Sequence, residues 1–419
     1  MTQELLLIFP FVILLLSIAI LPITSSEFWT KNYSKISISL SIIVIFYYVA
    51  IDGRGFKITH TIEEYFSFIS LLFSLYIVSG GIFIKIKGKS TPLRNVILLF
   101  VGGVMANVFG TTGSSMLLIR PYIESNKYRL KNYQIIFFIF IIGNIGGSLT
   151  PVGDPPLLIG YIKGVPFLWY FKNLIYIWLF AVAVLLLIFF IIDKYSYEKI
   201  KQTEQDSVEE KGERVKVEGI WNLIPLTMIV LSVLIQEPKF VREILMLLSA
   251  AVSYRLTSKA IHDKNHFSFE PIKEVSILFF GIFITMIPAL SFVSENSKNF
   301  GLDKLGNVYW FAGVLTSFLD NAPTFLNFLT GSMSSNNLSV DVKYNVIDFA
   351  NNYSVYLKAI SVASVFFGAM TYIGNAPNFM IKSIAEHKGV KMSGFFEYLY
   401  KYSLVILLPI FILIWYIFF

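Results

Sequence analysis

The sequence predicts an all-α polytopic membrane protein with about ten transmembrane helices and two opposed re-entrant hairpins, built as inverted-topology repeats with broken helices. Three observations predict this fold class. Of the 419 residues, 55% are hydrophobic and only 15% are charged, and the mean hydropathy is +0.68. Apolar stretches of about 20 residues, the length that spans a bilayer, recur along almost the whole chain. Glycine, proline and polar residues interrupt some of these stretches in their middles.

Composition also excludes several classes of function. The chain has no cysteine, which excludes disulfides, thiol catalysis and cysteine metal sites. Its net charge of +7 comes from basic residues in short loops, where they orient the protein in the membrane, so we expect no nucleic-acid partner. The chain has no Walker loop and neither an H-E-x-x-H nor a G-x-S-x-G motif. We therefore expect a transporter without a cofactor, and not an enzyme.

The apolar stretches divide the chain into two halves. The first stretch, Leu5 to Ile23, has no basic n-region and no A-x-A-like cleavage site, which predicts a retained helix and not a signal peptide. The stretch 193–219 mixes charges of both signs without an apolar face, which predicts a solvated linker. The predicted organisation is N-terminal transmembrane helices over 1–65; a first inverted repeat over 66–192, with a hairpin at 95–119 and a broken helix at 133–162; a cytoplasmic linker over 193–219; connecting helices over 220–257; and a second inverted repeat over 258–419, with a hairpin at 305–331 and a broken helix at 359–380.

Basic residues indicate how the two interrupted stretches 95–119 and 305–331 meet the membrane. A kinked helix has its two flanks on opposite sides, whereas a re-entrant hairpin has both on one side. The first stretch is strongly basic on both flanks, which favours a hairpin entered from the cytoplasm. The loop 331–354 after the second stretch has only Lys343, which suits the outer face. The basic flanks of the first stretch are Lys85, Lys87, Lys89 and Arg94 before it, and Arg120, Lys127, Arg129 and Lys131 after it.

A ten-residue motif occurs once in each half, after the interrupted stretch. It reads GSLTPVGDPP from Gly147 and GAMTYIGNAP from Gly368. Repeats of opposite orientation with helices broken at matching points are typical of secondary transporters. Without a gap, the motifs pair Gly147 with Gly368, Thr150 with Thr371, Gly153 with Gly374, Asp154 with Asn375 and Pro156 with Pro377; a weaker overlay of the hairpins pairs Asn107 with Ser317, Gly110 with Asp320, Thr111 with Asn321 and Ser114 with Thr324.

These breaks predict a cation site. Unwound backbone in the hydrocarbon region is tolerated only where protein buries it or it lines a watery cavity, so we expect the breaks to meet. Freed carbonyls, together with Asn, Thr and Ser oxygens, can replace the hydration shell of a small hard cation, whereas half-helix N-termini suit an anion. A packing role for the glycines can coexist with this interpretation. The expected break residues are Gly110, Gly113, Gly147, Gly153, Pro155, Pro156, Pro323, Gly368, Gly374 and Pro377.

Two carboxylates, Asp154 and Asp320, lie deep in the apolar stretches, each inside a break. An ionised acid there costs about 2.5 to 3.5 kcal/mol, which makes it a candidate functional residue. A carboxylate binds sodium when it is ionised and carries a proton when it is neutral, so one site can exchange the two ions. The alternative is that either aspartate caps the N-terminus of a half-helix.

The remaining polar residues are expected to be structural. All four histidines lie in predicted loops, so none is expected to relay protons within the membrane. Lys163, near the end of a stretch, is expected to extend to the membrane interface.

Four stretches of the chain carry a resemblance to a known family. They are residues 110–121 (GTTGSSMLLIRP), 144–169 (NIGGSLTPVGDPPLLIGYIKGVPFLW), 318–329 (FLDNAPTFLNFL) and 368–386 (GAMTYIGNAPNFMIKSIAE). They resemble the NhaD-type sodium/proton antiporters, within the ion transporter superfamily that includes citrate and dicarboxylate carriers and arsenite permeases. The resemblance implies a homodimer, in which a scaffold domain carries a mobile transport domain with two opposed hairpins.

The resemblance also implies a set of ion-binding positions. Carried over by motif, the sodium and proton positions are Asn107, Thr111, Thr112, Asp154, Asp320, Asn321, Thr371 and Asn375, and Thr150 completes the candidate set. The dicarboxylate carriers of the superfamily have a Ser-Asn-Thr pattern at the hairpin tips. Here the tips read Gly110-Thr-Thr and Asp320-Asn-Ala, which favours a cation over a carboxylate.

The sequence thus favours a sodium/proton antiporter in a bacterial inner membrane, exchanging cytoplasmic Na⁺ or Li⁺ for external H⁺ by alternating access. Asp154 and Asp320 are its expected proton carriers. The alternative is sodium- or proton-coupled transport of citrate or a dicarboxylate on the same scaffold. A membrane scaffold or receptor that transports nothing would leave both intramembrane aspartates unexplained.

Overall fold

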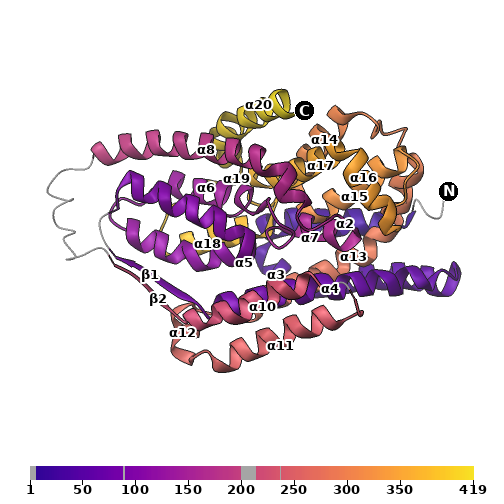
Figure 1. Cartoon of the computed structure of the whole chain (residues 1–419), viewed down its shortest axis with the longest axis horizontal. Coiled ribbons are helices and arrows are strands. Elements are labelled where there is room, and N and C mark those ends of the chain that lie inside the picture. Colours follow the sequence, from indigo (N-terminus) through magenta and orange to yellow (C-terminus); the bar gives the residue numbers. More distant parts are fainter. Residues whose placement is uncertain (1–5, 88–89, 200–213, 236) are drawn as a thin grey trace.

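The computed structural model describes residues 6–87, 90–199, 214–235 and 237–419, and these are nearly all helical (Figure 1). In Figure 1, β1 and β2 lie toward the left of the molecule and α2 and α16 toward the right. The elements are α2 (Ile8–Thr24), α3 (Ser26–Phe46), η1 (Tyr47–Ile51), α4 (Gly55–Gly80), β1 (Phe83–Lys87), α5 (Pro92–Asn126), α6 (Asn132–Ile141), η2 (Ile145–Gly147), α7 (Pro155–Lys163), α8 (Trp169–Glu198), β2 (Arg214–Glu218), η3 (Ile220–Asn222), α10 (Leu223–Val233), α11 (Val241–Leu256), α12 (Lys259–Lys264), α13 (Glu270–Asn296), α14 (Leu305–Phe318), α15 (Asn321–Ser335), α16 (Lys343–Asn352), α17 (Ser354–Phe366), η4 (Phe367–Met370), α18 (Ala376–His387), α19 (Phe395–Tyr398), η5 (Leu399–Leu407) and α20 (Leu408–Phe418).

The described residues include six helices that are long and apolar enough to cross a membrane, or up to seven if α16 and α17 count as one bent span. Shorter apolar helices at Ile8–Pro22, Asn132–Gly147 and Ile220–Val233 add to these. The protein is therefore a multi-pass membrane protein, as its composition predicts.

The first interrupted stretch, α5, is a helical hairpin. Its backbone is non-helical at Gly110, where φ is 75° and ψ is 159°. Near the two ends of α5, Asn95 Nδ2 donates a hydrogen bond to Asn126 Oδ1 at 2.8 Å. In a straight helix these two residues would lie about 46 Å apart, since each residue adds about 1.5 Å. The chain therefore reverses at Gly110, and its limbs extend beyond the predicted 95–119. We call α5 hairpin 1.

The second interrupted stretch, α14 and α15, is also a helical hairpin. The two helices are separated by Leu319 and Asp320, whose backbones are extended. Leu302, before α14, packs so closely on Gly331, near the end of α15, that a Cβ on this glycine would overlap its side chain. The limbs therefore lie side by side, and we call them hairpin 2. In Figure 1, hairpin 1 lies toward the end with β1 and β2, and hairpin 2 toward the opposite end.

Two broken helices lie between the hairpins. One is α6 followed by α7, and the other is α17 followed by α18. The residues before α7 and α18 have almost the same backbone conformation, with φ and ψ of −147° and 145° at Asp154 and −153° and 140° at Asn375. The half-helix α7 packs against α15, and α18 packs against α5. Each half-helix thus lies against the hairpin of the other repeat.

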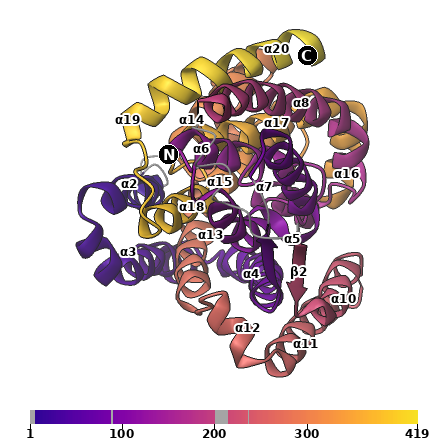
Figure 2. The same ribbon diagram turned by 90° about the vertical axis from the view of Figure 1, so that its left-hand side faces the viewer.

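The structure corrects the prediction of a linker over 193–219 at both ends. Helix α8 continues to Glu198, and β2 pairs antiparallel with β1, from Phe83 opposite Glu218 to Lys87 opposite Arg214. Residues 200–213 lie outside the described residues. This short ribbon is a departure from an all-helical fold. Figure 2 shows that α10, α11 and α12 lie on the far side of α4 from the hairpins.

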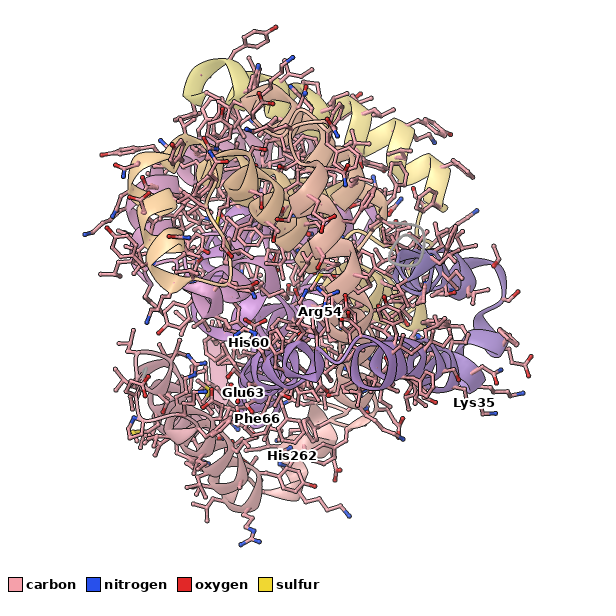
Figure 3. All side chains as sticks on the ribbon, turned by 90° about the vertical axis from the view of Figure 1, so that its right-hand side faces the viewer. Lys35, Arg54, His60, Glu63, Phe66 and His262 are labelled. Carbon is pink, nitrogen blue, oxygen red and sulfur yellow. The ribbon has the colours of Figure 1, made fainter. Side chains whose placement is uncertain are left out.

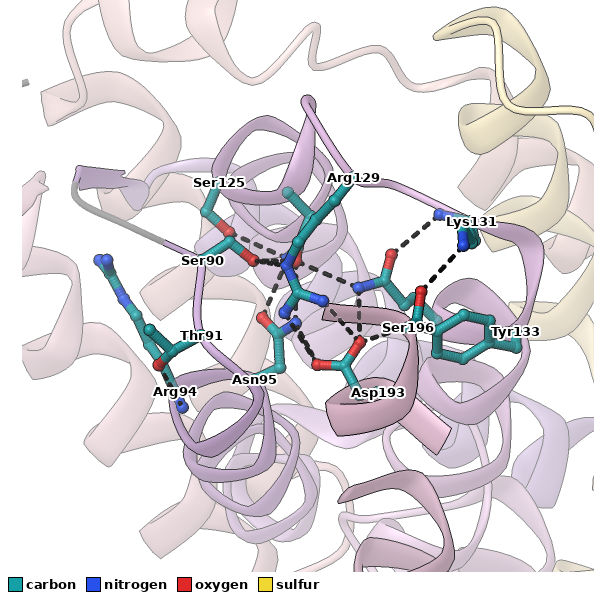
Figure 4. Close-up of polar contacts among 12 residues, drawn as sticks. Ser90, Thr91, Arg94, Asn95, Ser125, Arg129, Lys131, Tyr133, Asp193 and Ser196 are labelled. Atoms are coloured by element: carbon teal, nitrogen blue, oxygen red, sulfur yellow. Dashed lines mark hydrogen bonds and ion pairs between the residues drawn. The ribbon is translucent and has the colours of Figure 1, made fainter. Parts of the chain in front are cut away.

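Asp193, the first residue of that predicted linker, is fully buried in a polar cluster (Figure 4). Arg129 Nη1 and Nη2 each donate to its carboxylate at 2.8 Å. Tyr133 Oη, Gln134 Nε2 and Asn95 Nδ2 donate to it at 2.6, 3.1 and 3.2 Å. The cluster joins the base of hairpin 1 to α6 and α8. Sequence could not show this, because Arg129 lies 64 positions away along the chain.

Replacing Asp193 is expected to destabilise the protein strongly. In Asp193→Ala, the Arg129 guanidinium stays buried without its counter-charge, which costs about 3 to 5 kcal/mol. A thermal unfolding midpoint measured in detergent tests this. The control is Glu124→Ala, which removes an ion pair with Lys127 whose two side chains are 62% and 45% exposed, and it is expected to leave the midpoint unchanged. Equal midpoints for both variants would contradict the role of the cluster.

The two hairpin bases are expected to lie on opposite faces of the membrane. Lys127 follows hairpin 1 and Lys298 precedes hairpin 2, and both are exposed. Because the chain has no cysteine, Lys127→Cys and Lys298→Cys each give a single reactive thiol. An impermeant maleimide should label the second in right-side-out membranes and the first in inverted ones. Labelling of both from one face would rule out opposed hairpins.

Candidate functional site

The two hairpin tips and the two breaks meet at the carboxylate of Asp154, whose exposed fraction is 2%. Thr111, just after the turn of hairpin 1, donates its hydroxyl to Asp154 Oδ1 at 2.7 Å. Asn321, at the tip of hairpin 2, donates Nδ2 to Oδ2 at 2.6 Å. Asn375, in the second break, donates Nδ2 to Oδ1 at 3.2 Å. We call these four residues the Asp154 cluster.

The Asp154 cluster contains a negative charge and no positive one. The three donors are a hydroxyl and two amides, all neutral. Within the described part of the chain, no Lys, Arg or His forms an ion pair with Asp154. Buried charges in proteins are normally paired or bind a metal ion, because burying an unpaired carboxylate costs several kcal/mol. The site is therefore suited to binding a cation, either a proton or a metal ion.

One oxygen of the cluster is available to such an ion. Asn321 Oδ1 is buried and has no hydrogen-bond partner within the described residues. The Nδ2 of the same amide donates to Asp154 at 2.6 Å, so the amide oxygen lies close to the carboxylate. Amide and carboxylate oxygens are the ligands that hard cations prefer.

The predicted repeat is visible in matched hydrogen bonds. In the first half, Thr150 Oγ1 donates to the carbonyl of Asn107 at 2.6 Å. In the second half, the paired residue Thr371 donates its hydroxyl to the carbonyl of Ser317, which the overlay places opposite Asn107. Each threonine thus ties its break to the first limb of its own hairpin. Thr150 and Thr371 hold the backbone of the site and do not contact Asp154.

Two glycines allow the breaks to fold tightly. A Cβ on Gly153 would overlap the carbonyl oxygen of Gly147, and a Cβ on Gly374 would lie 2.7 Å from the carbonyl oxygen of Gly368. The Gly153 carbonyl in turn accepts the Thr111 N–H at 2.8 Å, next to Gly110 with its positive φ. The break and the tip of hairpin 1 therefore satisfy each other's backbone groups.

Besides Thr150 and Thr371, three more predicted site residues form no hydrogen bond with Asp154. Asp320 is half-buried, and its Oδ1 accepts the N–H of Ala322 at 3.0 Å, so it caps α15 as the alternative interpretation proposed. Asn107 supports the first break, since its Oδ1 accepts the Leu149 N–H at 2.8 Å. Thr112 lines a cleft of about 50 Å³ between the tip of hairpin 1 and helices α4 and α13.

Sequence reasoning missed two buried asparagines that join the breaks. Asn144 Nδ2 donates to Asn378 Oδ1 at 2.7 Å, and Asn375 Nδ2 donates to Asn144 Oδ1 at 3.2 Å. Asn378 Nδ2 donates to the carbonyls of Gly368 and Thr371 at 2.7 and 2.9 Å. Their positions in the sequence could have indicated this role, because Asn144 precedes the first motif by three positions and Asn378 directly follows Pro377 of the second.

Comparison with known proteins places this arrangement in a family. The whole chain, residues 1–419, matches the sequence model of a family described as "Putative citrate transport". The chain belongs to this family. Members of this citrate transport family are part of the ion transporter superfamily, and the protein is a secondary transporter rather than an enzyme. A search of the curated proteins gives no match.

The tight packing of the breaks predicts that a methyl group at Gly153 is not tolerated. Gly153→Ala would push its Cβ onto the carbonyl of Gly147, and overpacking of this kind costs about 1 to 3 kcal/mol. Gly394→Ala is the control, because nothing lies within 4 Å of its added Cβ. We expect the first variant to unfold at a lower temperature than the second in detergent. Equal unfolding temperatures would show that the breaks are loosely packed.

Proposed function

We propose that this protein is a sodium/proton antiporter that exchanges cytoplasmic Na⁺ or Li⁺ for external H⁺ by alternating access in a bacterial inner membrane. The observation that carries the proposal is the buried carboxylate of Asp154, which neutral donors hold at the meeting point of both hairpins. A site with one uncompensated negative charge binds one monovalent cation or one proton, and both compete for the same oxygens.

The same charge explains why the two ions would exchange. Asp154 is neutral overall with a proton or with Na⁺ bound, and it is negative when empty. An ionised acid at the centre of a membrane helix costs about 2.5 to 3.5 kcal/mol, so the loaded site moves across the barrier more readily than the empty one. The site can then return to face the cytoplasm only with an ion bound. A proton from outside therefore takes the place of the sodium ion that has left.

Asp154 and Asn321 are the proposed ligands of the ion. Asn321 offers its unpaired Oδ1, and Thr111 can offer its hydroxyl oxygen once its proton points away from the carboxylate. The amide of Asn375 would hold the carboxylate in place. Asp320 caps α15 with one oxygen, and we propose it as the second proton carrier.

The alternative is coupled transport of citrate or another carboxylate, and the family description favours it. The cleft beside Thr112 lies at the start of the second limb of hairpin 1, where backbone N–H groups attract an anion. Its volume is about 50 Å³, and no Lys, Arg or His is among the described residues that line it. Antiport is therefore the better supported function.

Reconstitution into liposomes tests the proposal. With the native protein, added Na⁺ should collapse an imposed pH gradient. Asp154→Asn should reduce this exchange to the rate of empty liposomes, because an amide neither ionises nor carries a proton. Glu124→Gln, a surface change at the base of hairpin 1, should exchange ions like the native protein. Uptake of labelled citrate driven by Na⁺, without collapse of the pH gradient, would contradict antiport and support the alternative.

A further inference from the structure

A cavity lies between hairpin 2, the end of α7 and helices α4 and α13, away from the Asp154 cluster. Its volume is about 360 Å³, and we call it the hairpin-2 cavity. One wall is formed by α15 and the end of α7, and the other by the first turns of α4 and the second half of α13. Beside the cavity, α15 packs on α13, where the hydroxyls of Ser294 and Ser334 hydrogen-bond at 2.7 Å. Figure 3 looks onto this end of the molecule, where His60 and Glu63 mark the beginning of α4. The lining residues used below are His60, Glu64, Lys163, Ser334 and Asp341.

A much smaller pocket lies at the matching position of the other repeat. The overlay that pairs Gly110 with Asp320 also pairs Met116 with Leu326 and Arg120 with Thr330. Leu326 and Thr330 line the hairpin-2 cavity, whereas Met116 and Arg120 line a pocket of about 10 Å³ against α4, which we call the hairpin-1 pocket. The two repeats therefore differ in this conformation, because one cleft between a hairpin and α4 is open and its counterpart is closed.

Lys163 forms an ion pair in the lining of the hairpin-2 cavity, where the end of α7 meets α4. Its Nζ lies 2.9 Å from Glu64 Oε1 on α4 and 3.2 Å from Asp341 Oδ1 in the segment after α15. Its exposed fraction is 7%, so surrounding protein shields most of its side chain. His60 Nδ1 lies 3.7 Å from the same Glu64 oxygen, and this histidine lies within α4 and not in a loop.

The two contacts of Lys163 join different parts of the molecule. Helix α7 packs against α15, and a Cβ on Gly164 would lie 2.9 Å from Lys343 Cγ, so the end of α7 and the segment around Asp341 form one unit. Glu64 instead belongs to α4, which packs against α11 and α13 and forms the surface on which hairpin 1 and α7 rest. The Glu64 side chain is 14% exposed and that of Asp341 is 70% exposed. The contact to α4 is therefore the better shielded from water, and the stronger one.

We propose that the Lys163–Glu64 ion pair is a latch that holds the hairpins against α4 in the conformation with the hairpin-2 cavity open. The proposal rests on the alternating access of the proposed function. For the hairpin-1 pocket to open, we expect the hairpins and α7 to slide along α4. Such a slide separates Lys163, on α7, from Glu64, on α4, and leaves the contact between Lys163 and Asp341 in place. Weakening the pair should therefore favour the conformation with the hairpin-1 pocket open.

Single cysteines report the two clefts in purified protein. Met116→Cys lies in the hairpin-1 pocket and Ser334→Cys in the hairpin-2 cavity, and the native chain contributes no thiol. Each cysteine variant is combined with Glu64→Gln, which keeps the shape of the Glu64 side chain and removes its charge. The matched control is Asp341→Asn, which removes the other carboxylate contact of the same lysine. The rate of reaction with a bulky maleimide in detergent is the measurement.

Glu64→Gln should raise the labelling rate at position 116 about fivefold or more and lower the rate at position 334, as expected for an allosteric coupling of ordinary strength. Asp341→Asn should change neither rate by more than about twofold. Exchange of the charges, with Glu64→Lys and Lys163→Glu in the Asp341→Asn background, should restore both rates. This rescue also shows that the variants fold.

Unchanged labelling in Glu64→Gln, or an equal effect of Asp341→Asn, would overturn the latch. The labelling experiment is run at fixed pH without Na⁺ or Li⁺ and measures no transport, so it separates the latch from the proposed function. A shift in labelling without sodium/proton exchange in liposomes would leave the latch standing and remove antiport. Sodium/proton exchange in liposomes together with unchanged labelling would support antiport and overturn the latch.

Discussion

The structure depends on the way in which two unwound segments satisfy each other's polar groups inside the membrane. Each break leaves peptide groups without helical partners, and an unsatisfied one costs several kcal/mol in hydrocarbon. The hairpins supply the partners, as when Thr111 donates its N–H to Gly153 and Thr150 donates its hydroxyl to Asn107. Asn378 does the same for the second break through the carbonyls of Gly368 and Thr371. Other hydrogen bonds join the two breaks, since Asn144 donates to Asn378 at 2.7 Å and Asn375 donates to the carbonyl of Gly143 at 3.2 Å. The two repeats therefore share one buried polar network.

The two breaks have matching backbones, but only the first of them carries a carboxylate. Asp154 and Asn375 occupy the same position before α7 and α18, with nearly the same backbone angles. Because one is a carboxylate and the other an amide, they attract each other, and Asn375 donates to Asp154 at 3.2 Å. Two carboxylates at this distance would repel each other. An asparagine at position 375 therefore keeps the geometry of both halves and leaves Asp154 as the one carboxylate at the two breaks.

The sequence predicted what depends on spacing within a motif. The positions of Asp154, Thr150 and Thr371 followed from a ten-residue pattern, and the structure brings all three to the breaks. It did not predict contacts that depend on packing between distant segments. The charged residues that follow Asp193 in the chain predicted a solvated linker there, yet Asp193 is fully buried. The cap formed by Asp320 was the alternative interpretation of this residue, and the structure shows it, since Asp320 directly precedes α15 and accepts the Ala322 N–H.

Two ion pairs, Arg129–Asp193 and Lys163–Glu64, differ in how completely protein surrounds them. This difference determines which pair can separate during a conformational change. Around Asp193, five donor atoms fill the carboxylate, and its partner Arg129 is 7% exposed, so no water is needed to complete the cluster. Separation of that pair would leave buried charges unmatched, which fixes α8 to hairpin 1. Among the described residues, Lys163 has two carboxylate partners, and it borders a cavity of about 360 Å³ that has room for water. Water can replace the lost contact there, so the same kind of bond can hold one conformation without preventing the next.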